Sequence, residues 1–261
     1  MSPGSTSAMP GAPEAVLTGV VLTLNESRHL PDCLASLAWC DRLLVLDSGS
    51  TDATQDIARR AGARLVEHPF ENYSRQRQQA MDLVSTPWLL FVDADERVSA
   101  DLALEIRSAI ADPSLAAAWI PRRNLFFGRA LRGGGWWPDP QLRLLRPACA
   151  HFDPARAVHE RAEVRGKIGR LAQPLLHINY ETRAEFVAKQ RGYARLEAAR
   201  RQAEGWQLKP RNYLLQPPRE AWRRLITLGG WTDGLLGLEL ALRMALYELW
   251  VLQAMAAADA R

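Results

Sequence analysis

Two aspartates, Asp93 and Asp95, follow an apolar run and are separated only by the small residue Ala94. The run, residues 87–92, is typical of a buried strand. Because side chains alternate along a strand, both carboxylates should point to the same side. Neighbouring carboxylates repel each other unless a cation or an arginine lies between them, and carboxylate oxygens suit Mg²⁺ and Mn²⁺. The pair is therefore consistent with a divalent metal site, and equally with a solvated turn or a helix cap.

Polar residues also follow two earlier apolar segments. Residues 15–24 lead into Asn25 and Glu26, and residues 42–46 lead into the loop Asp-Ser-Gly-Ser-Thr-Asp at 47–52. The loop stands between a strand and a helix, so its backbone N–H groups and the helix dipole can face an anion. This arrangement is consistent with a pocket for a phosphate-bearing ligand, or with an ordinary turn. The loop lacks the G-x-G-x-x-G and G-K-[ST] patterns, which argues against a dinucleotide site or a P-loop.

The elements that must position these residues alternate along the chain. The sequence predicts strands at 15–24, 42–46, 64–67 and 87–92, with helices at 30–37, 53–61 and 73–84 between them. Strands that alternate with helices indicate an α/β fold, with a parallel sheet, helices on both faces and functional loops at the carboxyl ends of the strands. All the polar groups above lie at such strand ends, which favours a single site.

After residue 100 the predicted helices and strands no longer alternate regularly. A helix at 101–110 is followed by strands at 116–122, 141–145 and 175–180, a loop at 151–160, and helical sequence at 184–204 and 217–258. We expect three parts: a disordered lead at 1–14, an α/β domain at 15–182 and a helical extension at 183–261.

Composition limits the class of protein. The 261 residues are 48% hydrophobic and 24% charged, which is ordinary for a globular chain, and the formal net charge is +4. Cys33, Cys40 and Cys149 follow no metal-ligand spacing and form no plausible disulfide framework, so a reducing, cytosolic compartment is expected. The first 13 residues have neither the basic nor the apolar region of a signal peptide.

Five segments in this order resemble the family-2 glycosyltransferases of GT-A fold. They are Thr-Leu-Asn-Glu at 23–26, Asp-Ser-Gly-Ser-Thr-Asp at 47–52, Asp-Ala-Asp-Glu at 93–96, Trp-Trp-Pro-Asp with Gln-Leu-Arg-Leu between 136 and 144, and Val-His-Glu at 158–160. The last two are similar in particular to the branch that includes bacterial lipopolysaccharide-core glucosyltransferases. The resemblance covers residues 16–180 and implies a GT-A, Rossmann-like sheet that binds a nucleotide-sugar donor, with UDP-sugar as the expected form.

The resemblance also implies donor-binding roles. The implied donor-binding residues are Thr23, Asn25, Glu26, Asp47, Ser48, Gly49, Ser50, Asp52, Arg77, Asp93, Ala94 and Arg143. Asp93 should lie near the ribose and the metal, as a metal ligand or as a partner of the ribose, and Asp95 should bind Mg²⁺ or Mn²⁺ directly. Arg77 stands where the branch usually has lysine, and a guanidinium can hold phosphate oxygens through two hydrogen bonds. Arg143 could bind phosphate or pair with a neighbouring acid.

Two further residues are candidates for the reaction itself. Asp139 is the expected general base that deprotonates the acceptor hydroxyl, because an inverting transfer needs a carboxylate opposite the departing diphosphate; the alternative is an acid in the turn between Pro138 and Pro140. His159 could complete the metal shell, since imidazole is an acceptable ligand, or it could be structural. Glu96 could simply begin the next turn.

The carboxyl-terminal third is basic and rich in tryptophan. Lys209, Arg211, Arg219, Arg223 and Arg224 lie near Trp206, Trp222 and Trp231 in the sequence. Basic residues beside tryptophan suit the headgroup region of an anionic bilayer. We expect either peripheral attachment to the cytoplasmic face of the bacterial inner membrane, or helices packed on the domain or in a dimer. A nucleic-acid partner is not expected, because no base-reading module is recognisable.

Three functions are therefore compared. The leading hypothesis is an inverting, metal-dependent glycosyltransferase that acts on a lipopolysaccharide-core or other cell-envelope glycan. The second keeps this chemistry but glycosylates a peptide or a lipid carrier. The third is a nucleotide-sugar-binding or membrane-scaffold protein without catalysis. Hydrolysis of the donor separates the third hypothesis from the first two.

Overall fold

The computed structural model describes residues 16–154 and 162–259, which form two compact units. Unit 1 comprises Met1–Ala94, Ile106–Ala118 and Leu142–Gly169, and unit 2 comprises Asp95–Glu105, Trp119–Gln141 and Arg170–Arg261. The predicted disordered lead at 1–14 lies outside the described residues. The predicted domain boundary at 182 does not coincide with this division and stays a prediction.

Unit 1 is built on a parallel sheet. Its strands are β1 (Leu17–Thr23), β2 (Arg42–Asp47), β3 (Arg64–Glu67) and β4 (Trp88–Asp93), in the spatial order β3-β2-β1-β4. The strand β8 (Asp139–Leu145) runs antiparallel to β4, with Leu145 opposite Leu89. In this register Thr23 lies opposite Asp47, and Leu22 lies opposite Asp93. The polar residues that follow these strands therefore start from the same edge, as the sequence predicts.

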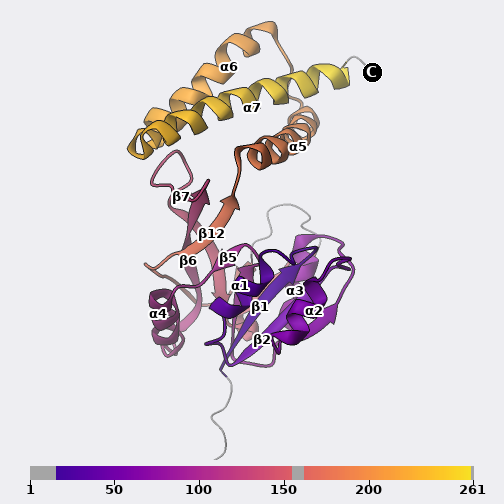
Figure 1. Ribbon diagram of the computed structural model, residues 1–261, viewed down its shortest axis with the longest axis vertical. Coiled ribbons are helices and arrows are strands. Elements are labelled where there is room, and N and C mark those ends of the chain that lie inside the picture. The colour runs from indigo at the N-terminus through magenta and orange to yellow at the C-terminus, as the bar shows by residue number, and fades with distance from the viewer. Residues whose placement is uncertain (1–15, 155–161, 260–261) are drawn as a thin grey trace, which may run out of the picture. The chain divides into compact units, whose positions relative to one another are not determined.

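Three helices cover this sheet (Figure 1): α1 (Leu30–Ser36), α2 (Thr54–Arg60) and α3 (Tyr73–Asp82). The buried residues Ala80 and Met81 of α3 pack on one face of the sheet, against Val20 and Leu44. Asn72 caps α3 by accepting a hydrogen bond from the Arg75 amide (2.9 Å). Helix α1 begins after His29, and no side chain caps it.

Short elements complete unit 1. A 3₁₀ turn, η1 (Pro147–Cys149), leads into β9 (Ala150–Phe152), which pairs antiparallel with β10 (Ala162–Val164); β11 (Lys167–Arg170) follows. The ring of Phe152 meets Phe91 edge-on at 5.9 Å. The segment predicted as a loop at 151–160 thus begins in a strand, and its residues 155–160 lie outside the described part of the chain.

The strands of unit 2 place polar residues in register. They are β5 (Glu96–Arg97), β6 (Leu115–Phe126), β7 (Arg129–Ala130) and β12 (Leu175–Tyr180); β6 and β8, with α4 (Ala100–Ile110), contribute residues to both units. Strand β12 runs parallel to β6 and antiparallel to β5. His177 of β12 therefore lies opposite Asn124 on one side and opposite Glu96 on the other.

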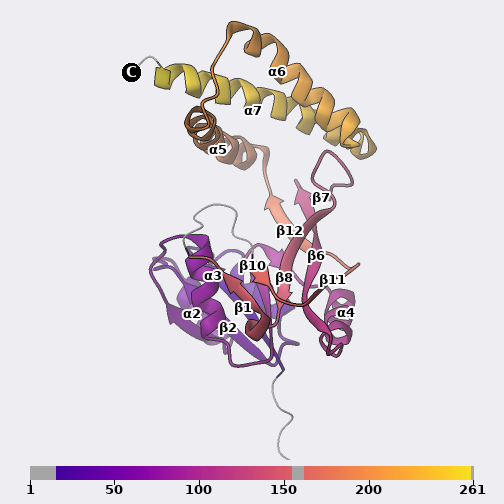
Figure 2. The ribbon, with the colours of Figure 1, turned by 180° about the vertical axis from the view of Figure 1, so that it is seen from behind.

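The carboxyl-terminal helices are α5 (Arg183–Ala203), α6 (Pro210–Trp222) and α7 (Leu235–Asp259), and α6 continues into the π-turn η2 (Arg223–Thr227) and the 3₁₀ turn η3 (Gly230–Asp233). Helices α6 and α7 lie side by side (Figure 2). The helix predicted at 217–258 is not continuous, because turns separate α6 from α7. Gly229 and Gly234 adopt positive φ angles of 69° and 62°, and such angles break a helix. No helix in the described part of the chain combines the length and apolarity needed to cross a bilayer.

Candidate functional site

Asp47 organises the loop that follows β2. It is fully buried, and its Oδ2 accepts hydrogen bonds from the hydroxyls of Thr23 (2.8 Å) and Ser50 (2.5 Å). Its Oδ1 accepts from the amides of Gly49 and Ser50 and from Gln55 Nε2. Burial alone would raise the pKa of Asp47, but these hydrogen bonds outweigh it and hold the pKa below its usual value. Asp47 therefore shapes the predicted donor loop from inside.

Asn25 and Asp52 tie the loops after β1 and β2 together. The Asn25 amide donates to Ser50 Oγ (2.8 Å), and its side-chain oxygen accepts from the Thr51 amide (2.9 Å). Asn25 has a φ of 55°, a left-handed conformation that asparagine tolerates. Asp52 accepts from both the amide and the hydroxyl of Thr54, and from the Ser27 amide. These hydrogen bonds, that of Thr54 first, lower the pKa of Asp52.

Ser48 and Glu26 belong to the same edge. The Glu26 amide donates to Thr54 Oγ1 (2.8 Å). Ser48 Oγ accepts from Nε2 of Gln76, a buried residue of α3 whose Oε1 lies 2.6 Å from Nδ1 of His68. The sequence missed Gln76, because a glutamine on a charged helix carries no signal of its own. Gln76 and His68 fix the loop after β2 against α3.

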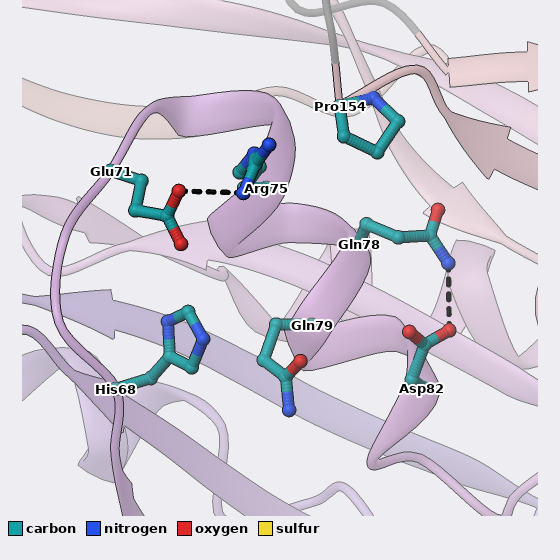
Figure 3. Close-up of a pocket in the computed structure, with 7 residues that line it drawn as sticks. All are labelled: His68, Glu71, Arg75, Gln78, Gln79, Asp82 and Pro154. Atoms are coloured by element: carbon teal, nitrogen blue, oxygen red, sulfur yellow. Dashed lines mark hydrogen bonds and ion pairs between the residues drawn. The ribbon is translucent and has the colours of Figure 1, made fainter.

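A pocket of about 390 Å³ lies along α3 and includes His68 in its lining (Figure 3). Its other lining residues are Glu71, Arg75, Gln78, Gln79, Asp82 and Pro154. Four of the lining residues are paired with each other, Arg75 with Glu71 (2.6 Å) and Gln78 with Asp82 (2.7 Å). It contains none of the predicted donor-binding residues.

Two arginines hold Asp93. Nη1 and Nη2 of Arg143 donate to its two carboxylate oxygens, and Nη2 of Arg77 lies 3.5 Å from Oδ1. The Arg143 side chain is only 4% exposed, whereas the Asp93 side chain is 35% exposed. The Arg77 guanidinium also stacks over the Phe91 ring at 5.0 Å. Three residues predicted from separate segments are thus in contact within unit 1.

Asp95 instead pairs with a histidine. Its Oδ2 lies 3.2 Å from Nε2 of His177, and Nδ1 of His177 lies 2.6 Å from Oδ1 of Asn124. Asn124 Nδ2 donates to the carbonyl oxygen of Trp136 (2.8 Å), which turns Oδ1 toward the imidazole. With Nδ1 donating to Asn124, Nε2 is the imidazole nitrogen that faces Asp95; it can offer a lone pair to a metal ion or, when the ring is protonated, donate to the carboxylate. The sequence missed this partner, because His177 lies inside an apolar strand.

The Asp95–His177 pair fits a divalent cation. Nε2 and the carboxylate oxygen lie 3.2 Å apart, and either a proton or a metal ion can be shared by these two atoms. Imidazole and carboxylate are ligands for Mn²⁺, and a hydrogen bond to the second imidazole nitrogen is the usual support of a metal-binding histidine. Within the described residues, no group of three or more His, Cys, Asp or Glu side chains could hold a metal. His159 lies outside them.

Asp139 is held by Arg122. Its Oδ2 accepts from Nε (2.8 Å) and Nη2 (2.7 Å) of Arg122 and from Asn124 Nδ2 (3.3 Å), while Gln141 donates to Oδ1 (2.8 Å). Burial alone would raise the pKa of Asp139, but the charge and hydrogen bonds of Arg122 outweigh it and lower the pKa. Nη1 of Arg122 also lies 3.4 Å from the fully buried Glu96. Asp139 is therefore ionised at neutral pH, as a proton acceptor must be.

A parallel sheet with polar loops at its carboxyl edge, bordered by an antiparallel strand, is the GT-A class of nucleotide-diphospho-sugar transferase fold. The family model described as Glycosyl transferase family 2 matches residues 19–154. The chain belongs to this family, which makes a sugar-transferring enzyme the supported class of function.

Two individual proteins are similar to this chain over most of its length. The chain is 30% identical, over 248 residues, to the lipopolysaccharide core biosynthesis glycosyltransferase LpsC of Rhizobium meliloti (strain 1021), and the match covers 90% of each chain. It is also 30% identical to a TPR repeat-containing protein of Synechococcus elongatus, over 75% of this chain and 49% of that one.

Solved structures resemble the chain less closely. S. aureus TarS matches with a TM-score of 0.47 and 18% identity, over 70% of this chain and 39% of that one. A second match is glucosyl-3-phosphoglycerate synthase from Mycobacterium tuberculosis, in complex with Mn²⁺, uridine-diphosphate and glucosyl-3-phosphoglycerate. Its TM-score is 0.40 and its identity 18%, over 55% of this chain and 64% of that one.

Proposed function

We propose that the protein is an inverting, metal-dependent glycosyltransferase that moves a sugar from a UDP-sugar to a glycan acceptor of the lipopolysaccharide core or another cell-envelope glycan. Membership of family 2 and the similarity to LpsC over 90% of both chains support this function. The observation that carries it is the contrast within Asp93-Ala94-Asp95, where one carboxylate meets two guanidiniums and the other meets an imidazole.

The donor diphosphate would be bound at the carboxyl edge of unit 1. Arg77 and Arg143 can donate paired hydrogen bonds to phosphate oxygens, and they are already fixed by Asp93. The loop at 47–52, with Thr23, Asn25 and Glu26, would line the nucleoside pocket. Because its side chain is held by arginines, Asp93 is better suited to orient these groups and the ribose than to bind the metal directly.

Asp95 and His177 would hold Mg²⁺ or Mn²⁺, and the predicted ligand His159 remains a candidate for the same ion. When bound, the ion would act as a Lewis acid that neutralises the leaving diphosphate. Asn124 would keep His177 in the tautomer that leaves Nε2 free to bind metal.

Asp139 would take the proton from the acceptor hydroxyl as that oxygen attacks the anomeric carbon. Its lowered pKa means that it is ionised and ready to accept, at the cost of some basicity. Arg122 and Gln141 would hold the carboxylate in one orientation. The proton transferred to Asp139 can then pass to solvent after the product leaves.

A donor-hydrolysis assay tests this function. Purified protein with UDP-sugars and Mn²⁺ should release UDP, and the same donors should raise its melting temperature. The Asp95→Ala variant should lose the metal-dependent release, while Asp101→Ala, a change at an exposed aspartate of α4, should keep it. Donor binding without any turnover would favour the non-catalytic binding protein, and turnover with a peptide or a lipid carrier as acceptor would favour the second hypothesis.

The proposed place of action is the cytoplasmic face of the bacterial inner membrane, where a lipid-linked glycan acceptor is made available. The similarity to an enzyme named for lipopolysaccharide core biosynthesis supports an acceptor of this kind.

A further inference from the structure

Helix α7 carries an exposed row of leucines. Leu235, Leu238, Leu242 and Leu246 are between 41% and 85% exposed. Their spacing of three, four and four residues puts them on one face of the helix. The opposite face is buried, through Leu236, Leu240 and Met244, in a core with Phe126 and Phe186. Helix α7 is therefore apolar on both sides, although among the described residues only one side is covered and the leucine row stays exposed.

Helix α6 and the turns that follow it add exposed apolar residues, including two tryptophans. Leu214, Leu215 and Ile226 are 78%, 59% and 44% exposed, and Trp222 and Trp231 are 65% and 64% exposed. We call residues 210–246, with these side chains and the leucine row, the α6–α7 hairpin. Trp206, which the sequence grouped with these tryptophans, is instead partly buried beside α7, with the Arg201 guanidinium 5.5 Å from its ring.

The charge around these residues is positive. The α6–α7 hairpin has five arginines against three Asp and Glu, a net charge of +2, and Lys209 directly precedes it. Lys209, Arg211 and Arg219 are exposed, and Arg211 and Arg219 form no ion pair with an acid in the described residues. Glu220 is already paired with Arg223 and Arg224.

We propose that the α6–α7 hairpin is a membrane-docking surface that inserts its leucines and tryptophans into the interface of an anionic lipid bilayer. Exposed tryptophan and leucine beside unpaired arginine is the chemistry that headgroups and acyl chains recognise together. A second copy of the chain fits less well, because its matching surface would carry the same excess of positive charge, whereas an anionic bilayer complements that charge. This inference rests on the proposed function only in that the acceptor would be lipid-linked.

Hydrogen bonds connect the α6–α7 hairpin to the loop that leads to Asp139. Asp233 accepts hydrogen bonds from the amides of Arg132 (2.9 Å) and Gly133 (3.0 Å). Gly134 donates to the Leu228 carbonyl (2.7 Å), and a Cβ added to Gly133 would lie 2.2 Å from the Gly229 oxygen. The loop therefore follows the hairpin closely, and docking of the hairpin would orient the segment that ends at Asp139.

Vesicle flotation of the full-length protein tests the proposal. The wild type should float with phosphatidylcholine vesicles that contain phosphatidylglycerol, and much less with phosphatidylcholine alone. The double variant Leu235→Asp/Leu242→Asp should stay at the bottom of the gradient. Its matched control is Leu104→Asp/Leu196→Asp, which changes leucines that are 71% and 69% exposed on other helices, and this control should float like the wild type.

A second variant tests the charge. Arg211→Gln/Arg219→Gln should lower partitioning into anionic vesicles by about 30-fold, because each basic residue near the surface contributes about 1 kcal/mol. Unchanged flotation of both double variants, or a wild type that stays at the bottom with anionic vesicles, would overturn the proposal. A wild-type dimer in solution that Leu235→Asp/Leu242→Asp dissociates would do so as well, by assigning the face to a second copy.

Donor hydrolysis separates this inference from the proposed function. Both hairpin variants should release UDP from a UDP-sugar in lipid-free solution at the wild-type rate, because their changed side chains lie on the exposed faces of the helices. A wild type that floats but never hydrolyses a donor would contradict the proposed enzyme and leave the membrane surface supported.

Discussion

Asp93 and Asp95 are separated by one residue, yet they belong to different units and have opposite surroundings. Asp93 is neutralised by the guanidiniums of Arg143 and Arg77 in unit 1. Asp95 faces Nε2 of the His177 imidazole in unit 2, at 3.2 Å, and no arginine or lysine forms an ion pair with it among the described residues. Under the proposed function this difference would be a division of labour, with the first carboxylate holding the phosphate-binding groups in place and the second available to a metal ion.

The two units also differ in how their polar groups are satisfied. In unit 1, Asp47 receives five hydrogen bonds from the loop at 47–52 and its neighbours, so it fixes the shape of this loop. In unit 2, Asp139 and His177 are connected through Asn124, so a change at one affects the orientation of the other. Under the proposed function, the first arrangement would suit binding of the donor, and the second would suit metal binding and proton transfer.

The largest effect is expected at Asp139. The Asp139→Asn variant should lose transfer by about 10²–10⁴-fold, the usual contribution of a general base, while it binds the donor as the wild type does. Steady-state rates with a glycan acceptor, together with thermal shifts by UDP-sugar, measure the two properties separately. Transfer at the wild-type rate would remove Asp139 as the base.

Asn124 should affect metal affinity, because it holds the His177 ring in place. The Asn124→Ala variant frees the His177 ring, and loss of such a supporting hydrogen bond lowers metal affinity by about 10–100-fold. Titration of Mn²⁺ by calorimetry gives this ratio directly. The Asn179→Ala variant is the control, because Asn179 donates to the same Asn124 oxygen (3.2 Å) without touching the imidazole, and its effect should be much smaller.

Removal of Arg143 should affect stability in unit 1. The Arg143→Gln variant leaves Asp93 with Arg77 as its cationic partner, and loss of a charged hydrogen-bonded pair costs about 2 kcal/mol of unfolding free energy. Denaturant unfolding measures it, with Arg42→Gln as the control for an exposed arginine that donates to Ser85. An equal loss of unfolding free energy in both variants would show that the Asp93–Arg143 pair stabilises the fold no more than an exposed arginine does.

Asp47 should give a smaller, pH-dependent effect. The Asp47→Asn variant should lose about 1.5 kcal/mol of unfolding free energy at neutral pH, against little change in Asp56→Asn, whose side chain is 68% exposed. The folded pKa of Asp47 lies below 3.8, so its contribution is complete above that value and disappears as the pH falls through the folded pKa. The wild type and Asp47→Asn should therefore converge in acid, and a constant difference down to low pH would contradict this assignment.

Much of unit 1 could be predicted from sequence because its signals are local. Periodic apolar residues and the acids after β2 and β4 indicated the strands, the sheet and its polar edge. His177 and Asn124 could not be recognised, because their importance comes from strand pairing between segments more than 50 residues apart. The turn between α6 and α7 was overlooked although Gly229, Gly230 and Gly234 mark it, since the surrounding leucines suggested continuous helix.

The most direct test of the division of labour is a Mn²⁺ titration of Asp93→Asn and Asp95→Asn by calorimetry in the presence of UDP, after thermal unfolding has shown that both variants fold. We predict that Asp95→Asn loses Mn²⁺ binding and that Asp93→Asn retains it. Loss of Mn²⁺ binding in Asp93→Asn with retention in Asp95→Asn would contradict the account.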